Sequence, residues 1–194
     1  MDVISIVGMA GLGKTSLACK VYNNCSITIH FDVRVWCTVS QTYNKRNLLL
    51  GILRQIMGDK SDNVDDPVVT CCGKHLMGRR YLVVLDDMPE PQAWDDLGLC
   101  FPCRENGSRI MVTTRNEELA RYIKHHSDPY LLPFLRDEDS WELLQKKVFQ
   151  GESCPSELLN VGPLVAKKCK GLPYLIIADC RNSFKKKKGT ISVA

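Results

Sequence analysis

The N-terminal two thirds of the chain alternates between short apolar runs and segments with helical periodicity. Val3 to Val7 is an apolar run interrupted only by Ser5, which is typical of a strand buried in a parallel sheet. Further strands are predicted at Val33–Val39, Tyr81–Leu85 and Ser108–Thr114. Helices are predicted around Leu17–Val21, at Lys45–Met57 and at Val68–Met77. This alternation predicts an α/β domain with a mainly parallel sheet.

From about Arg136 the pattern becomes entirely helical. The apolar residues Trp141, Leu144 and Val148 lie on one helical face, and Asp137 or Asp139 is suited to cap that helix. A short helix is predicted next, with Pro163 as its first residue and Gly171 just past its end. A last apolar helical piece covers Tyr174 to Cys180.

These patterns divide the chain into three parts. Residues 1–135 are predicted to form the α/β domain, and residues 136–180 a small helical subdomain. Residues 181–194 lack apolar periodicity, so we expect a disordered tail there.

Composition and charge narrow the function classes. The 194 residues are 44% apolar and 25% charged, which is typical of a globular chain with a real core. Lys185–Lys188 account for the whole net charge of +4, so the body has no basic surface typical of nucleic-acid binding. That lysine run is either a localisation or anionic-surface patch or a solvated tail. No apolar run is long enough to span a bilayer, so we expect no membrane-spanning segment. The start Met1–Ile4 does not resemble a secretory signal, so we expect none there.

The cysteine pattern favours reduced thiols in the cytoplasm. There are ten cysteines, but nothing indicates the export that a disulfide framework requires. Cys100 and Cys103 form a C-x-x-C pair without a second pair at zinc-ligand spacing. The neighbours His125 and His126 would point in different directions on a helix. We therefore expect no zinc.

A glycine-rich segment between the first strand and the first helix fits the phosphate-binding pattern G-x-x-x-x-G-K-[ST]. Glycines let the backbone wrap a phosphate closely and expose N–H donors, while the helix start adds partial positive charge. Lys14 is expected to neutralise the β- and γ-phosphates, and the Thr15 hydroxyl to hold Mg²⁺. The predicted nucleotide-binding residues of this loop are Gly8, Met9, Ala10, Gly11, Leu12, Gly13, Lys14, Thr15 and Ser16.

Polar residues at two other strand ends extend this candidate site. Asp86 and Asp87 follow Tyr81–Leu85; alone such a pair is an ordinary turn, but beside a phosphate loop a carboxylate there reaches Mg²⁺. Asp86 is the expected metal partner, through a water, and Asp87 is expected to polarise the attacking water or to position the loop. Arg115 follows Thr114 and is either a sensor of the γ-phosphate or a solvated arginine.

Together these segments resemble one family, the NB-ARC nucleotide-binding domain of plant disease-resistance receptors. Six blocks match in order over about Val3 to Ala178: Gly8–Thr15, Phe31–Ser40, Tyr81–Asp87, Gly107–Arg115, Leu131–Phe149 and Cys169–Pro173. The stretch Leu135–Trp141 resembles the late-blight-resistance branch found in nightshades.

The resemblance implies a P-loop NTPase sheet with flanking helices, followed by the first helical ARC subdomain. It also implies a slow ADP/ATP switch of the STAND class in a cytoplasmic receptor for plant defence and the hypersensitive response. Asp86 would be the metal-binding acid, Asp87 the residue linked to hydrolysis, and Arg115 the sensor arginine. Pro173 would pack on the adenine side of the nucleotide, a role that only the family suggests. The implied partners are other domains of the same receptor, or other receptors.

The chain departs from the family pattern at several positions. Ala10 replaces a glycine, Met88-Pro89 replaces Val-Trp after the acids, and Tyr174 replaces the leucine after Gly-Leu-Pro. The pattern is lost at about Asp179, before the winged-helix subdomain, the Met-His-Asp motif and the repeats of the family. We therefore expect a truncated fragment in which nucleotide binding survives and switching is incomplete.

Two other functions fit the sequence. A self-contained P-loop ATPase or small-molecule kinase would need a substrate lid, and Arg79-Arg80 is the only arginine pair suited to one. A regulatory remnant would bind other receptors without nucleotide, through apolar surface left exposed by the missing subdomain.

Overall fold

The computed structural model describes residues 1–39, 41–58, 67–103, 105–149, 153–187 and 190–193, with side chains as far as residue 178. The chain divides into two compact units, which we describe separately. The first comprises Met1–Gly8 and Lys14–Leu132, and the second comprises Met9–Gly13 and Pro133–Ala194. The second unit begins after Leu132, three residues before the predicted boundary, and it includes the middle of the glycine-rich loop.

The first unit is built on a five-stranded sheet with strand order β2-β3-β4-β1-β5, in which every pair of neighbours is parallel. Its strands are β1 (Asp2–Val7), β2 (Val33–Thr38), β3 (Tyr81–Met88), β4 (Arg109–Thr114) and β5 (Tyr130–Leu131). The predicted parallel sheet is confirmed. β3 continues three residues beyond the predicted end at Leu85, so Asp86 and Asp87 lie within the strand. β5 has only two residues, too few to show an alternating pattern.

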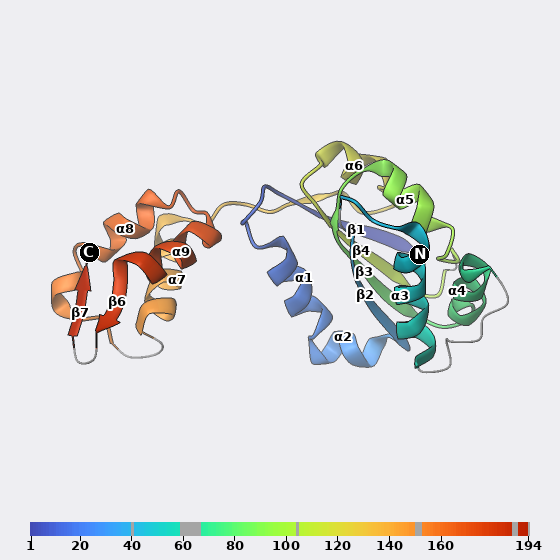
Figure 1. Cartoon of the computed structure of the whole chain (residues 1–194), viewed down its shortest axis with the longest axis horizontal. Helices are drawn as coiled ribbons and strands as arrows, with labels where there is room; N and C mark the ends of the chain where they lie inside the picture. Colours follow the sequence, from blue (N-terminus) through green and yellow to red (C-terminus); the bar gives the residue numbers. More distant parts are fainter. Residues whose placement is uncertain (40, 59–66, 104, 150–152, 188–189, 194) are drawn as a thin grey trace. The chain divides into compact units, whose positions relative to one another are not determined.

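Helices cover both faces of this sheet (Figure 1). They are α1 (Lys14–Tyr22), α2 (Cys25–His30), α3 (Lys45–Met57), α4 (Val68–Leu76), α5 (Pro91–Gly98) and α6 (Glu117–Tyr122). α1 packs on one face through Ala18, against Val84 and Met111. The larger core lies on the other face, where the helices α3 to α6 bury apolar residues against Val83 and Leu85.

Three predicted helices are present. The helix around Leu17–Val21 is α1, the helix at Lys45–Met57 is α3, and the helix predicted at Val68–Met77 is α4, which ends one residue earlier. The sequence did not predict α2, α5 or α6, which have six to eight residues each. Two turns or fewer contain too few apolar positions to show a helical period. Their signals are at their ends: the side chains of Asn24 and Asn116 accept hydrogen bonds from the first turns of α2 and α6.

The second unit is largely helical. It contains α7 (Asp137–Phe149), the 3₁₀ turn η2 (Ser156–Leu158), α8 (Gly162–Lys168) and α9 (Pro173–Ser183), followed by the strands β6 (Phe184–Lys187) and β7 (Thr190–Val193). The buried core of the unit comprises Leu144, Phe149, Leu158, Ala166, Cys169 and Ile176. α9 runs beyond Cys180, and β6 and β7 pair antiparallel where the sequence predicts a tail without regular structure. β-Branched residues at Thr190, Ile191 and Val193 favour that strand conformation.

Two positions in this unit have room only for glycine, because neighbouring atoms lie where a Cβ would be. Gly171 has φ +70°, and a Cβ there would lie 2.3 Å from the Leu135 carbonyl oxygen. The Gly171 carbonyl also accepts a hydrogen bond of 2.9 Å from the Leu135 N–H. A Cβ on Gly162, the first residue of α8, would lie 2.2 Å from the Trp141 ring. The close packing of α7 on the start of α8 therefore depends on the missing side chain.

Among the described residues no helix is both long and apolar enough to cross a membrane. No disulfide links the cysteines whose side chains are described.

Candidate functional site

The residues that the motifs single out in the first unit gather where the strands end. Parallel strands have their carboxyl ends at one edge of a sheet, and polar groups there form the usual ligand site of α/β folds. Gly8 follows β1, and its N–H donates to the carbonyl of Thr114, the last residue of β4, at 3.2 Å. Asp86 and Asp87 lie near the end of β3, and β3 pairs with β4. The sheet therefore brings together three segments far apart in the sequence.

Lys14 is the buried cation of this edge. Lys14 is the first residue of α1 and is only 7% exposed, and its Nζ donates to the Gly8 carbonyl at 2.7 Å. Burial and the nearby Arg115 lower its pKa, while Asp87 and Asp86 oppose that change. A partly desolvated ammonium is suited to bind an anion, because few water contacts have to be removed first.

Asp86 joins α1 to the sheet through hydrogen bonds. Its carboxylate is 5% exposed and accepts from the Thr15 hydroxyl, at 2.9 Å to Oδ1 and 3.2 Å to Oδ2. The Thr113 hydroxyl of β4 donates to Oδ1 at 2.6 Å. A hydroxyl and a carboxylate in contact are the hard oxygen donors that Mg²⁺ prefers, so the Thr15 and Asp86 pair fits the metal that a phosphate loop implies.

Asp87 has an unusual backbone. Its φ is +56°, in the left-handed region that non-glycine residues seldom occupy, and the pairing of β3 with β4 shifts register between Leu85 and Met88. The Asp87 N–H donates to the Thr113 hydroxyl at 2.9 Å, so this threonine connects the two acids. Backbone strain of this kind is often found at functional residues, where the surrounding structure holds it.

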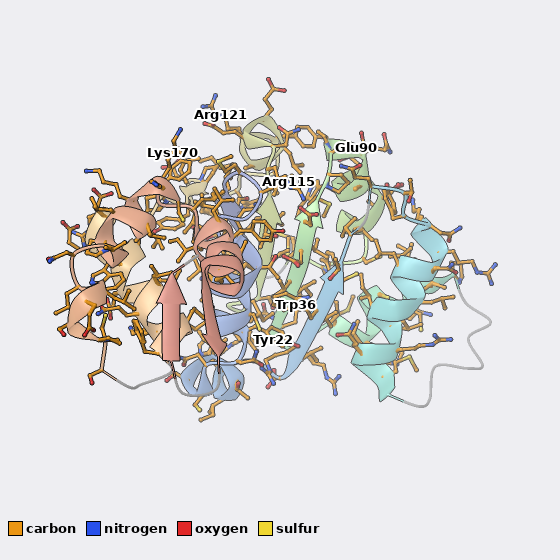
Figure 2. The ribbon with its side chains drawn as sticks, turned by 60° about the vertical axis from the view of Figure 1, so that its left-hand side comes forward. Tyr22, Trp36, Glu90, Arg115, Arg121 and Lys170 are labelled. Carbon is orange, nitrogen blue, oxygen red and sulfur yellow. The ribbon has the colours of Figure 1, made fainter. Side chains whose placement is uncertain are left out.

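Arg115 lies just beyond β4 (Figure 2). It pairs with the second acid, Asp87. Its Nη2 lies 3.3 Å from Oδ2 of Asp87, and both side chains are about half exposed. The pair lines a cavity of about 210 Å³ together with Gln41, Pro89 and Asn116. A half-exposed guanidinium held by one carboxylate beside an open cavity is able to exchange that partner for an incoming anion.

Thr15 and Ser16 lie on the exposed side of α1. They line an open hollow of about 660 Å³ with Cys19, Lys20 and Asn23. The predicted site residues of the first unit are thus Gly8, Lys14, Thr15, Ser16, Asp86, Asp87 and Arg115, and α1 and the ends of β1, β3 and β4 position them.

Sequence reasoning missed two threonines and one glutamine at this edge. Thr113 and Thr114 are both 0% exposed, and Thr114 Oγ1 donates to the Met88 carbonyl at 2.8 Å. This bond ties the altered Met88-Pro89 turn to β4. The signal was two hydroxyl residues ending an otherwise apolar strand, a position next to the acids in a parallel sheet. Gln41 gave no comparable signal, since it belongs to no periodic segment.

The middle of the glycine-rich loop belongs to the second unit, together with the start of α9. Gly11 and Gly13 have φ of +79° and +100°, which explains why glycine occupies both positions. The Gly11 carbonyl accepts from the Tyr174 N–H at 3.1 Å, and a Cβ on Gly11 would lie 2.7 Å from the Tyr174 Cβ. Pro173 is the first residue of α9.

Side-chain burial along this loop varies. Met9 and Ala10 are exposed, so the methyl group at position 10 meets no crowding, whereas Leu12 is buried.

The NB-ARC domain family matches residues 1–154 of the chain, which covers the glycine-rich loop, both acids and Arg115. The chain belongs to the NB-ARC family. The predicted resemblance is confirmed. Since the matched region includes the whole first unit, the polar edge described above is the edge of an NB-ARC domain.

Curated relatives of this NB-ARC chain come from Solanum demissum. One late blight resistance protein homolog of that plant is 46% identical over 179 residues, which is 91% of this chain and 23% of that protein. A second late blight resistance protein homolog is 45% identical over the same share of this chain and 14% of its own length. The chain therefore spans less than a quarter of the length of these two relatives.

Solved structures share the fold of this NB-ARC chain at lower identity. A STAND protein with a tetratricopeptide-repeat sensor from Pyrococcus horikoshii aligns with a TM-score of 0.57 and 20% identity, over 89% of this chain and 26% of its own. The ORC2 protein of Aeropyrum pernix aligns with a TM-score of 0.60 and 16% identity, over 92% of this chain and 54% of its own. The fold is that of the P-loop NTPases, as predicted.

Proposed function

We propose that this NB-ARC chain binds an adenine nucleotide, ADP or ATP, together with Mg²⁺. The observation that supports this most directly is the contact between the Thr15 hydroxyl and the Asp86 carboxylate, two residues 71 positions apart. A phosphate loop requires a hydroxyl and an acid within reach of one metal ion, and α1 and β3 supply that pair.

Each residue has a distinct task in this proposal. The loop Gly8–Ser16 surrounds the phosphates with backbone N–H groups, and Lys14 neutralises the β- and γ-phosphates. Thr15 and Asp86 hold Mg²⁺, Asp86 through a water, and the ion when bound neutralises charge on the phosphates. Pro173 packs on the adenine side, a role transferred from the family.

Asp87 and Arg115 provide the sensing and hydrolytic part of the proposal. Arg115 lies 3.3 Å from Asp87, and a γ-phosphate is a stronger partner for a guanidinium than one exposed carboxylate. ATP therefore draws Arg115 from Asp87 for part of the time and leaves the acid free to polarise water, whereas ADP leaves the ion pair in place. Hydrolysis is slow because Arg115 still occupies Asp87 for the rest of the time.

In the full-length receptor this exchange would change the packing of domains. We propose a cytoplasmic plant immune receptor in which this chain is the nucleotide-binding module, and which acts in defence and the hypersensitive response. Its partners would be the other domains of the same receptor, or related receptors. The late blight resistance homologs above support this assignment by their identity over 91% of the chain.

The test is to identify the nucleotide that the purified chain retains. The protein is denatured, and the released nucleotide is separated by chromatography and quantified. We expect near-stoichiometric ADP from the wild type and from Lys147→Ala, an exposed lysine of α7, and none from Lys14→Ala.

Other results would favour the competing functions. No nucleotide from any of the folded proteins would contradict the proposal and favour a regulatory remnant. Steady-state turnover of about 1 per second or faster would favour a self-contained enzyme.

A further inference from the structure

A second polar cluster lies at the opposite edge of the sheet, where β1 begins. Asp2 is the first residue of β1, and the strand rises about 3.3 Å per residue, so Asp2 lies about 20 Å from the phosphate-loop end. After α6 the chain passes back to this edge: Ile123 is buried, and residues 125–127 form a bend next to Asp2. The cluster is therefore separate from the nucleotide site.

The Asp2 carboxylate fixes the backbone of that bend. Its Oδ1 accepts from the N–H groups of His126 at 3.1 Å and Ser127 at 3.4 Å, and also from Val3 at 2.9 Å. Its Oδ2 accepts from the Ser127 hydroxyl at 2.6 Å. These bonds hold the carboxyl ionised and keep the pKa of Asp2 at about 2 although burial opposes it. A carboxylate oxygen has about two lone pairs, so Oδ2 retains one for a further partner.

The two imidazoles above this carboxylate face one another. Nδ1 of His125 lies 2.8 Å from Nδ1 of His126, and the ring centroids are 4.5 Å apart. Nδ1 of His126 is also 3.7 Å from Oδ1 of Asp2, and one ligand atom from each of the three residues lies within 4.8 Å of the others. Two nitrogens this close cannot both bear protons, so at least one directs a lone pair at its neighbour.

This geometry approaches that of a metal site. In tetrahedral zinc sites the bonds to nitrogen and oxygen are about 2.0–2.1 Å, which places neighbouring ligand atoms about 3.3 Å apart. The two imidazole nitrogens, 2.8 Å apart, are closer than that value, and a carboxylate oxygen of Asp2 lies within 4.8 Å of a ring nitrogen of each histidine. Both imidazoles are exposed, and the bend itself is held by Asp2 and by buried Ile123, so rotation of the rings is the change that ligation requires.

We infer that His125, His126 and Asp2 form a binding site for a divalent transition metal of the zinc type, with water as the remaining ligand. Two imidazole nitrogens and one carboxylate favour Zn²⁺, Co²⁺ or Ni²⁺ over Mg²⁺, which prefers oxygen donors. The bound ion would tie the start of β1 to the segment between α6 and β5. The sequence analysis expected no zinc at these histidines, because the side chains of adjacent residues point in different directions on a helix. In the structure α6 ends at Tyr122, so neither histidine lies on a helix.

The test uses the untagged chain with zinc chloride as the probe, in the presence of a phosphine reductant. Long-range proton–nitrogen NMR of the imidazoles distinguishes metal binding at Nδ1 from binding at Nε2, residue by residue. The chain has four histidines, so His30 and His75 serve as internal controls. This readout also separates imidazole ligation from zinc bound by the exposed thiols of Cys19, Cys25 and Cys103.

We expect one equivalent of zinc to shift Nδ1 of His125 and His126, with His30 and His75 unchanged, and excess Mg²⁺ not to reverse the shift. His126→Ala should abolish the effect at His125. Asp2→Asn, which keeps an oxygen to accept from the bend, should weaken zinc binding at least tenfold while the spectrum of the sheet stays folded.

Two results would overturn the inference. One is the absence of any Nδ1 shift, which would make the contact a plain hydrogen bond between imidazoles. The other is an equal shift at all four histidines, which would mean nonspecific binding.

Discussion

Thr113 is a buried hydroxyl that connects the two acids of the nucleotide site. It donates to Asp86 at 2.6 Å and accepts from the Asp87 N–H at 2.9 Å, so both acids depend on it for their positions. The site residues Lys14, Thr15 and Asp86 were predictable because the phosphate-loop pattern names them directly. Thr113 was not, because its role arises only from the register of β3 and β4.

We predict that Thr113→Val impairs Mg²⁺-dependent nucleotide binding. The substitution preserves shape but removes the acceptor of the part-buried Asp87 N–H and one of the two hydroxyls that donate to Asp86, at a cost of about 1–3 kcal/mol in the free energy of unfolding. Nucleotide affinity with and without Mg²⁺, and thermal unfolding, measure the two effects. Thr28→Val on the exposed surface of α2 is the matched control and should leave both unchanged. Affinity at the wild-type level in the Thr113 variant would contradict this role.

Arg115 tests whether a single side chain distinguishes ATP from ADP. Its partner Asp87 is half exposed, so the ion pair itself contributes little to stability. We predict that Arg115→Ala leaves unfolding nearly unchanged and removes the difference between the dissociation constants for ADP and a non-hydrolysable ATP analogue.

Arg121→Ala is the control for that measurement, because Arg121 also forms an exposed ion pair but lies on α6 (Figure 2). If the two variants discriminate equally well between the nucleotides, Arg115 is not a sensor.

At the scale of elements, the junction of α7 and α8 depends on a glycine. A Cβ at Gly162 would lie 2.2 Å from the Trp141 ring, so Gly162→Ala forces the ring or α8 to move. We predict destabilisation of the second unit by about 1–3 kcal/mol, measured by denaturant unfolding. Gly51→Ala in α3, where nothing lies within 4 Å, should instead stabilise by about 0.5–1 kcal/mol. Equal effects of the two substitutions would show that the ring contact is unimportant.

Asp96 links α5 to the start of α3. Its carboxylate accepts from Lys45 Nζ at 2.7 Å and from the Tyr43 hydroxyl at 2.6 Å, and these bonds lower its pKa in the folded chain. A lowered pKa gives stability that is present above the ordinary aspartate range near pH 4 and is lost as pH falls through the folded value.

We therefore predict that the stability difference between wild type and Asp96→Asn is present at pH 7 and shrinks below pH 4. Thermal unfolding across that pH range measures it. Asp95→Asn on the same helix is the control; it loses a contact with Tyr122 but not the two bonds that lower the Asp96 pKa. A difference that stays constant with pH would contradict the assignment.

The long elements were predictable from periodicity and the short ones were not. α3 begins and ends at the predicted residues Lys45 and Met57, because thirteen residues are enough to repeat an apolar face. α2 and α6 have six residues each and were recognisable only by their asparagine caps. The bend at His125 was not predicted for the same reason, since the sequence showed neither α6 nor its end at Tyr122.

At the scale of the whole molecule, the family assignment came from the order of motifs along the chain. No single motif gave it, because a phosphate loop occurs in many folds and an acidic pair in many turns. Spatial grouping was less accessible: the centre of the glycine-rich loop belongs with α9 in the second unit, through the bond between Gly11 and Tyr174. Contacts between residues so far apart in the chain leave no periodic trace in the sequence.

The edge formed by Lys14, Thr15 and Asp86 is proposed to bind a nucleotide with its metal. Calorimetric titration of ADP into the nucleotide-free chain, with Mg²⁺ and with a chelator, measures both parts of that binding. We predict stoichiometric binding that weakens at least tenfold, or about 1.4 kcal/mol, without Mg²⁺. Asp86→Asn should bind equally weakly in both conditions. A folded wild type that binds no ADP, or an Asp86→Asn variant that keeps the full Mg²⁺ effect, would contradict the claim.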